Sequence, residues 1–171
     1  MSFTQRATTL AALGLLALTA AACATAPIPP ANLAGGGGAP VPVAGYDWFL
    51  HQDGEAARLV FGLEESDDLK LALDCERGKG RLELSALAPK GAKPEIYLEA
   101  GGETERFAAV SEPSQLDDGL FLTAQASPRT PVFQRFAQTG WMALWRGNER
   151  QMMAGHPGAD DRARRFLAFC G

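Results

Sequence analysis

Apolar and polar residues alternate most clearly between Leu69 and Cys75. Leucine or cysteine occupies every second position of this segment, and Lys, Ala and Asp occupy the positions between them. Side chains of a β-strand point alternately to its two faces, so the pattern predicts a strand with one buried and one solvated face. A second alternating segment, residues 81–86, follows a turn that contains Gly78 and Gly80, and the two segments together predict a β-hairpin.

Shorter segments along the chain show the same alternation more weakly. Three segments with this weaker alternation are predicted as strands: residues 96–100, 106–110 and 120–124. Residues 46–51 and 57–61 are predicted as outer strands ahead of the hairpin, and residues 141–145 as a further strand. The pairs Gly101-Gly102 and Asp118-Gly119 separate some of these segments as turns. Residues 141–145 are apolar at almost every position, so we expect this strand to be covered on both faces.

Two helices are predicted in the last third of the chain. The first begins at Pro131, with Thr130 expected to cap it, and ends before Gly140. The second runs from about Ala159 to Phe169, where apolar residues recur at helical spacing and arginines follow two aspartates by four residues. Strands in series with two late helices predict an α+β fold, mainly antiparallel β (sandwich or partial barrel), with two short helices near the C-terminus.

The N-terminal segment has the composition of an export signal. Residues 1–9 are polar with Arg6 as the single charge, and residues 10–22 are apolar and uncharged. This apolar stretch is shorter than the roughly 20 residues that cross a bilayer as a helix. A basic start, a short apolar middle and a small-residue end indicate a secretory signal peptide over residues 1–22.

The end of this signal resembles the lipobox of bacterial lipoproteins. The run Leu18-Thr19-Ala20-Ala21-Ala22-Cys23 places small residues before a cysteine, although Ala20 stands where that family usually has leucine. The resemblance implies acylation of Cys23 and a lipid anchor in the membrane. Ala24, in place of the aspartate that often follows the cysteine of inner-membrane lipoproteins, favours the periplasmic face of the outer membrane. Cleavage by an ordinary signal peptidase is the alternative, because three alanines also suit that enzyme.

The cysteine count favours acylation. The chain has three cysteines, Cys23, Cys75 and Cys170, and an exported chain lies in an oxidising compartment. If Cys23 carries the lipid, the other two form an even pair. We therefore expect a Cys75–Cys170 disulfide that ties the last helix to the sheet and stabilises the domain by roughly 4 to 5 kcal/mol.

Composition divides the rest of the chain into a linker and one domain. Residues 23–44 hold the anchor cysteine and a stretch rich in proline and glycine, which predicts a flexible linker. Residues 45–171 are expected to form a single β-rich envelope domain. Removal of residues 1–22 takes away Arg6 and leaves 15 of the 16 basic residues against 20 acidic ones, a net charge of −5. This balance argues against nucleic acid as a partner, because binding it requires a basic stripe.

The sequence predicts no catalytic or metal site, and no cofactor is expected. His51 and His156 are the two histidines, and neither has a partner at metal-ligand spacing. Three pairs of adjacent aspartates are expected to form turns or caps, with calcium in a loop as the alternative: Asp67-Asp68, Asp117-Asp118 and Asp160-Asp161. The glycine run from Gly35 to Gly38 follows no predicted strand, which argues against a phosphate-binding loop.

The three tryptophans are expected to lie in the core. Trp48, Trp141 and Trp145 have apolar neighbours, which favours burial. A ligand groove lined by these rings is the alternative interpretation.

Short motifs of the domain resemble small exported domains of proteobacterial envelopes. These motifs are Tyr46-Asp47-Trp48, Phe61-Gly62, Ser66-Asp67-Asp68-Leu69, Leu73-Asp74-Cys75 and Arg165-Phe166-Leu167-Ala168-Phe169-Cys170. The resemblance covers most of residues 46–171 and implies an envelope location without an assigned activity. A more distant similarity is to the lipoprotein inhibitors of lysozyme, which are small disulfide-bonded β-barrels.

The expected function is binding rather than catalysis. We expect a non-enzymatic exported lipoprotein domain that binds or supports another envelope component, either a protein or the cell wall. The alternatives are a cell-envelope hydrolase with an unrecognised site and a lysozyme-inhibitor-like protein. Two convergent carboxylates in a pocket, or a histidine in contact with a carboxylate, would favour the hydrolase. An exposed apolar patch without such a pocket would favour the binding module.

Overall fold

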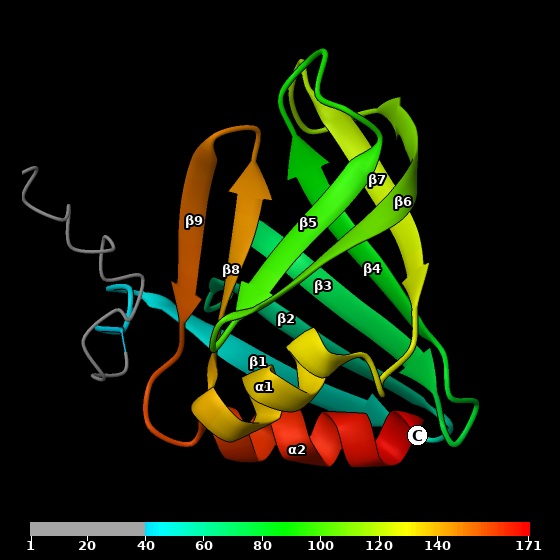
Figure 1. The fold of residues 1–171 in the computed structure, drawn as a ribbon, viewed down its shortest axis with the longest axis vertical. Helices are drawn as coiled ribbons and strands as arrows, with labels where there is room; N and C mark the ends of the chain where they lie inside the picture. Colours follow the sequence, from blue (N-terminus) through cyan, green and yellow to red (C-terminus); the bar gives the residue numbers. More distant parts are fainter. Residues whose placement is uncertain (1–39) are drawn as a thin grey trace, which may run out of the picture. The chain divides into compact units, whose positions relative to one another are not determined.

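The fold comprises nine strands and two helices within residues 40–171, which are the residues that the computed structural model describes (Figure 1). The elements are β1 (Tyr46–Asp53), β2 (Ala56–Leu63), β3 (Leu69–Glu76), β4 (Leu82–Ala88), β5 (Glu95–Ala100), β6 (Glu103–Pro113), β7 (Leu120–Ala126), α1 (Pro131–Thr139), β8 (Trp141–Arg146), β9 (Glu149–Ala154) and α2 (Ala159–Cys170). The predicted signal peptide and Cys23 lie outside the described residues, so export and acylation stay predictions.

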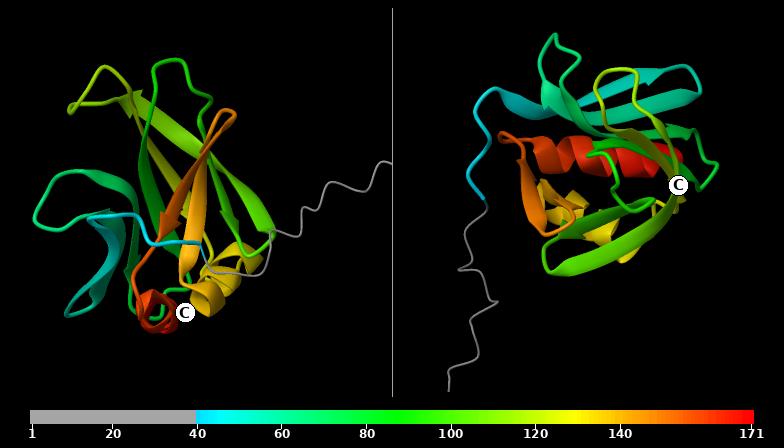
Figure 2. Two further views of the ribbon diagram at one scale, coloured as in Figure 1. Left: turned by 90° about the vertical axis from the view of Figure 1, so that its left-hand side faces the viewer. Right: turned by 90° about the horizontal axis from the view of Figure 1, so that it is seen from above.

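The strands form one sheet that curls into a nearly closed barrel (Figures 1 and 2). Their order across the sheet is β1-β2-β3-β4-β7-β6-β5-β8-β9, and neighbouring strands pair antiparallel. The predicted fold class, mainly antiparallel β with two short helices, is confirmed. Of the two architectures expected, the structure is the partial barrel.

All eight strands expected from the sequence are present, whereas β9 was missed. The inward-facing positions of β9 include Glu149 and Gln151, which pair with Arg146 and Leu144 of β8. Since polar residues therefore occupy both faces of β9, the sequence carries no alternation that could reveal this strand.

The two helices lie side by side across one end of the barrel (Figure 1). Their aromatic side chains Phe133, Phe136 and Phe166 are fully buried. The Phe136 ring lies 4.5 Å from the ring of Trp48, which is also fully buried, as expected for this tryptophan. Full burial of one such phenylalanine contributes about 1.5 to 3 kcal/mol, so the helices supply a large part of the core.

The ends of α1 follow the sequence signals except at the cap. Pro131 is the first helical residue, and Gly140 ends the helix in the left-handed conformation, with φ of 71°. A Cβ at position 140 would lie 2.9 Å from the backbone nitrogen of Asp160, so glycine is required there. Thr130 occupies the N-cap position as predicted, but its side chain makes no capping hydrogen bond; its hydroxyl donates to the backbone oxygen of Ser127 at 2.8 Å.

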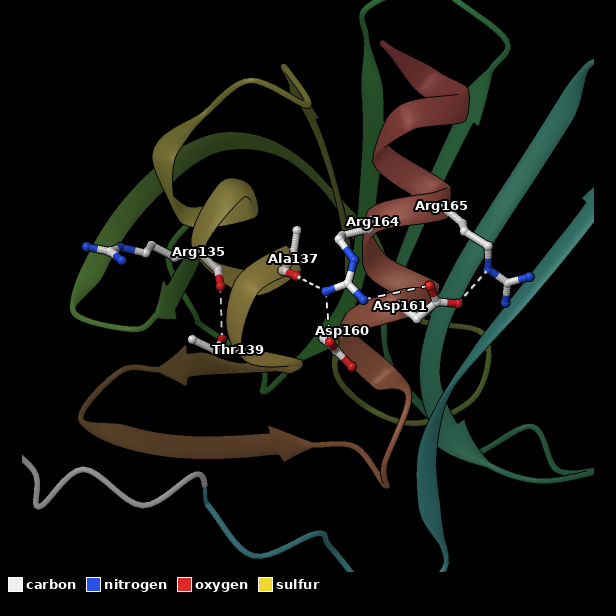
Figure 3. Close-up of polar contacts among 7 residues, drawn as sticks. All are labelled: Arg135, Ala137, Thr139, Asp160, Asp161, Arg164 and Arg165. Atoms are coloured by element: carbon white, nitrogen blue, oxygen red, sulfur yellow. Dashed lines mark hydrogen bonds and ion pairs between the residues drawn. The ribbon is translucent and has the colours of Figure 1, made fainter.

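The predicted ion pairs along α2 are confirmed (Figure 3). Arg164 lies 2.8 Å from Asp160, and Arg165 lies 3.1 Å from Asp161. Arg164 also donates to the backbone oxygen of Ala137 at 3.2 Å, which ties α2 to α1. These side chains are about half exposed, so each pair contributes at most about 1 kcal/mol.

The two edge strands approach each other without forming a regular ladder. The indole nitrogen of Trp48 on β1 donates to the backbone oxygen of Met153 on β9 at 3.1 Å. The backbone nitrogen of Val43, just before β1, donates to the backbone oxygen of Ala154 at 3.3 Å. Individual hydrogen bonds therefore hold the barrel together at this seam.

Asp47 joins the seam to α2. Its Oδ1 accepts from the backbone nitrogen of His156 at 2.9 Å, and its Oδ2 accepts from Arg162 at 2.6 Å. A Cβ on Gly155 would lie 2.7 Å from Asp47 Oδ1, so only glycine leaves room for this carboxylate.

The expected disulfide is present between the end of β3 and the end of α2. Cys75 and Cys170 are 95 residues apart in the chain, and their Cα atoms are 5.7 Å apart. The bond fixes α2 to the sheet at the closed end of the barrel, which is the role predicted for it.

Candidate functional site

A row of polar side chains crosses five adjacent strands on the outer face of the barrel. His51 on β1, Arg58 on β2, Asp74 on β3, Glu83 on β4 and Gln125 on β7 are successive partners in the antiparallel ladders. We call these five residues the groove row. Apart from half-buried Asp74, their side chains are exposed.

The alternation seen in the sequence is what directs the groove row outward. Leu73 and Cys75 flank Asp74 on β3, and Leu82 and Leu84 flank Glu83 on β4; these four residues pack in or against the core. Because side chains alternate along a strand, the residues between them must face away from the core.

A groove of about 580 Å³ lies over this row. Its size falls within the roughly 300 to 1,000 Å³ that is typical of small-ligand sites. Two further outward-facing residues nearby, Val60 and Ala72, are 6% and 3% exposed although neither belongs to the core cluster, in keeping with a recessed outer face. The groove is lined by His51, Asp53, Ala56, Ala57, Arg58, Asp74, Cys75, Glu76, Lys79, Arg81, Leu82, Glu83 and Gln125.

Asp74 has the perturbed carboxyl group of the groove. Burial raises the pKa of Asp74, the Arg58 guanidinium opposes that rise, and the neighbouring Glu83 carboxylate adds to it. Arg58 Nε lies 3.4 Å from Asp74 Oδ1, and Glu83 Oε2 accepts a hydrogen bond from Gln125 Nε2 at 3.1 Å. Two carboxyl groups therefore stand side by side with incomplete charge compensation.

The turn between β3 and β4 forms one rim of the groove and is anchored to α2. The backbone nitrogens of Gly78 and Gly80 donate to the backbone oxygens of Phe169 and Cys170 at 2.9 and 2.7 Å. Both glycines have positive φ, at 63° and 64°, a conformation that other residues adopt at a cost. The disulfide adds a covalent link, and its Cys75 also lines the groove. The rim that carries Lys79 is thus held from three points.

Arg77 joins this turn to the β1–β2 hairpin. Its side chain donates to the backbone oxygen of Gly54 at 2.9 Å, and its backbone nitrogen donates to the backbone oxygen of Glu55 at 2.8 Å. The guanidinium carbon lies 4.1 Å from the centre of the Phe169 ring. The two turns at this end of the groove are therefore held together and to α2 by one arginine.

A second row on the outer face has a different character. Arg106 on β6, Tyr97 on β5, Trp145 on β8 and Arg150 on β9 are successive ladder partners, and we call them the aromatic row. The Arg106 guanidinium carbon lies 3.9 Å from the centre of the Tyr97 ring, which stacks on Trp145 at 5.7 Å between ring centres.

Glu99 completes the aromatic row. It accepts hydrogen bonds from Trp145 Nε1 at 2.9 Å and from Arg150 at 2.6 and 2.8 Å. The bonds from Arg150 lower the pKa of Glu99, burial opposes the shift, and the Trp145 bond lowers the pKa further. On the outer face of β8, Ala143 is fully buried but Trp141 and Trp145 are only partly buried, so this face is covered less completely than the sequence predicted.

The residues that the sequence singled out are dispersed. His51 lines the groove, whereas His156 lies in the loop after β9 and is not part of the groove lining. Within residues 40–171, no group of three or more histidine, cysteine or acidic residues is arranged to hold a metal ion. No helix in the described part of the chain is long and apolar enough to span a membrane.

The predicted aspartate pairs serve as turns and ion-pair partners. Asp68 accepts hydrogen bonds from the Tyr46 hydroxyl and from Lys70. The bond from Lys70 lowers the pKa of Asp68 most, and the bond from Tyr46 lowers it further. Asp117 accepts from the backbone nitrogen of Gly119 at 2.9 Å in the turn before β7. Neither pair lines the groove, whose carboxylates the sequence did not single out.

The groove carboxylates were missed because their proximity depends on strand register. The alternation alone places Asp74 and Glu83 on the outer face of one hairpin, and this signal was available. Their direct opposition, and the continuation of the row to β7 across a nonsequential pairing, follow only from the ladder.

Comparisons of the chain with protein-family models, with curated proteins and with solved structures find no match.

Proposed function

We propose that the chain is an exported lipoprotein whose β-domain binds another component of the cell envelope in the groove, without catalysing a reaction. The observation that carries the proposal is the groove row, a continuous line of polar side chains beneath a cavity of about 580 Å³. Such a row suits recognition of a polar ligand, because its donors and acceptors are aligned by the sheet before the ligand arrives.

Export and anchoring rest on the sequence. The lipobox-like run that ends at Cys23 and the linker over residues 24–44 support a domain tethered to a membrane. Mass spectrometry of the N-terminal peptide of the purified protein tests this part. An acylated Cys23 as the first residue is expected, and a free thiol at Cys23 in the mature protein would contradict it.

An affinity capture with a charge-reversal variant tests the binding function. The full chain in detergent is immobilised and exposed to a solubilised envelope extract, and the retained components are identified by mass spectrometry. The variants are Glu83→Lys, at the centre of the groove row, and Glu64→Lys, at an exposed position between β2 and β3 that does not line the groove.

We expect an envelope component that the wild type and Glu64→Lys retain and that Glu83→Lys does not. Circular dichroism checks that both variants are folded. Equal retention by all three proteins would place the contact outside the groove, and retention of nothing would count against a stable envelope partner.

A hydrolase is the second candidate function. The adjacent carboxyl groups of Asp74 and Glu83 favour it, and a raised pKa is the property of a carboxyl group that serves as a general acid. We rank it second for two reasons. Asp74 and Glu83 are neighbours on one face of the same hairpin and do not converge from opposite sides of the groove, and Arg58, rather than His51, is the ladder partner of Asp74. Release of reducing ends or peptides from purified cell wall, abolished by Asp74→Asn, would reverse this ranking.

A further inference from the structure

We propose that the ligand of the groove is a zwitterionic peptide group, whose ammonium lies between Asp74 and Glu83 and whose carboxylate meets the cationic rim. The inference rests on the proposed binding function and names the ligand class. It follows from which atoms of the groove already have partners and which do not.

The first step concerns the carboxylate oxygens. Asp74 Oδ1 faces Arg58 Nε at 3.4 Å, and Glu83 Oε2 accepts from Gln125. Within residues 40–171, no hydrogen bond engages Asp74 Oδ2 or Glu83 Oε1. An ammonium carries three donors and no acceptor, so a primary amine can satisfy both oxygens at once.

The second step concerns charge. Asp74 and Glu83 are direct ladder partners, and like charges at directly opposite positions destabilise each other. A cation placed between them removes this repulsion. The partial burial of Asp74 strengthens the attraction between the cation and the carboxylates. An anionic or neutral ligand at the same point would leave the repulsion in place.

The third step concerns the rim. Lys79 and Arg81 line the groove beside these carboxylates, and in the described part of the chain neither forms an ion pair. The turn that carries Lys79 is fixed by the disulfide and by two backbone hydrogen bonds to α2. The rim thus offers two cations on a backbone that is held in place, and a peptide supplies the carboxylate to meet them, whereas a simple amine does not.

A pair of matched peptides tests the proposal. The probes are acetyl-glycyl-lysyl-glycine, which carries an ammonium and a carboxylate, and the same peptide with an acetylated lysine amine. Their affinities for the disulfide-intact full chain are measured from backbone amide shifts in NMR titrations. The lysine peptide is expected to shift amides of β3 and β4, and acetylation is expected to weaken binding by about tenfold or more.

Substitutions and pH provide the controls. Asp74→Asn and Glu83→Gln are each expected to weaken binding of the lysine peptide by about tenfold, and Glu64→Gln to leave it unchanged. Binding is expected to weaken on acidification as Asp74 takes up a proton, in a pH range above that of an ordinary aspartate. The charged groups that shift the pKa of Asp74 are Arg58 on β2 and Glu83 on β4, with Asp53, Glu76, Lys79 and Arg81 also lining the groove; His51 ends the row, so His51→Gln must keep this pH dependence.

Three results would overturn the ligand class: equal binding of the two peptides, binding insensitive to both substitutions, or no binding by either peptide up to about 10 mM. None of these results would affect the outcome of the capture experiment, because that experiment tests binding in the groove and does not depend on an ammonium group. A retained envelope component lost by Glu83→Lys, combined with any of the three, would leave the binding function standing with a different ligand class.

Discussion

The groove row and the aromatic row both cross neighbouring strands on the outer face of the barrel, yet they differ in how their charges are paired. In the aromatic row, Glu99 accepts three hydrogen bonds, one from Trp145 and two from Arg150. In the groove row, Asp74 Oδ1 lies 3.4 Å from Arg58 Nε, and another carboxylate stands on the other side of Asp74.

The carboxyl pKa values record this difference. The pKa of Glu99 is lowered, chiefly by Arg150, so the fold stabilises its charged form. The pKa of Asp74 is raised, chiefly by burial, so the fold disfavours its charged form. The fully paired row fastens β8 and β9 to the sheet, whereas the incompletely paired row leaves charge that the proposed ligand would compensate.

Removal of the disulfide gives the largest expected effect on stability. It should also alter the surroundings of the groove row and leave the aromatic row unchanged. Cys75→Ala together with Cys170→Ala is expected to lower the free energy of unfolding by roughly 4 to 5 kcal/mol, because the bond closes a loop of 95 residues. Urea unfolding of the unreduced protein measures the loss. NMR shifts should change at Lys79 on the rim but not at the Trp145 indole. A loss below about 1 kcal/mol would contradict the role given to this bond.

Glu99→Gln tests the aromatic row. The substitution removes a charge from three hydrogen bonds and is expected to lower the free energy of unfolding at pH 7 by about 1 to 2 kcal/mol. Since the pKa of Glu99 is lowered on folding, its contribution is complete above its unfolded pKa and is lost as the pH falls through the folded one. Wild type and variant should therefore converge in acid, and a gap that persists there would contradict the assignment.

Glu95→Gln is the matched control for this prediction. Glu95 meets Arg106 in the same part of the sheet, but it is 33% exposed against 17% for Glu99. Its loss is expected to cost at most about 1 kcal/mol.

Asp74→Asn should change the free energy of unfolding in the opposite direction and by the smallest amount. Because burial raises the pKa of Asp74, the folded state binds its proton more tightly, and wild-type stability falls as the pH rises through this range. Removing the charge is expected to raise the free energy of unfolding at pH 7 by a few tenths of a kcal/mol, a value discounted for the exposure of the carboxylate. Thermal unfolding at pH 7 and in acid measures it, and a clear destabilisation at pH 7 would make Asp74 a structural residue.

Much of the architecture could be predicted from the alternation of side chains. Leu69 to Cys75 identified β3 because one face of this strand packs in the core and the other faces the groove. The strand β9 was not predictable, since Glu149 and Gln151 face inward and remove the contrast between its faces. Thr130 was correctly predicted as the N-cap residue, but its hydroxyl donates to the backbone oxygen of Ser127 and accepts no hydrogen bond from α1.

Only part of the groove could be predicted from the sequence. Asp74 and Glu83 could be assigned to the outer face, but their opposition requires the hairpin register, which the loop over residues 77–81 sets. The contribution of Gln125 depends on β7 pairing with β4, a contact between segments that are not consecutive. Pairings of this kind leave no local pattern in the chain.

Photo-crosslinking in living cells tests whether the groove is the binding site for an envelope component. A benzoylphenylalanine is placed at Gln125, at the β7 end of the groove row, or at Gln138, an exposed position on α1 outside the groove. Irradiation is followed by isolation of adducts and mass spectrometry. We expect one discrete adduct with an envelope component from position 125 and none from position 138. Adducts of equal yield from both positions, or from position 138 alone, would contradict the assignment of the groove as the binding site.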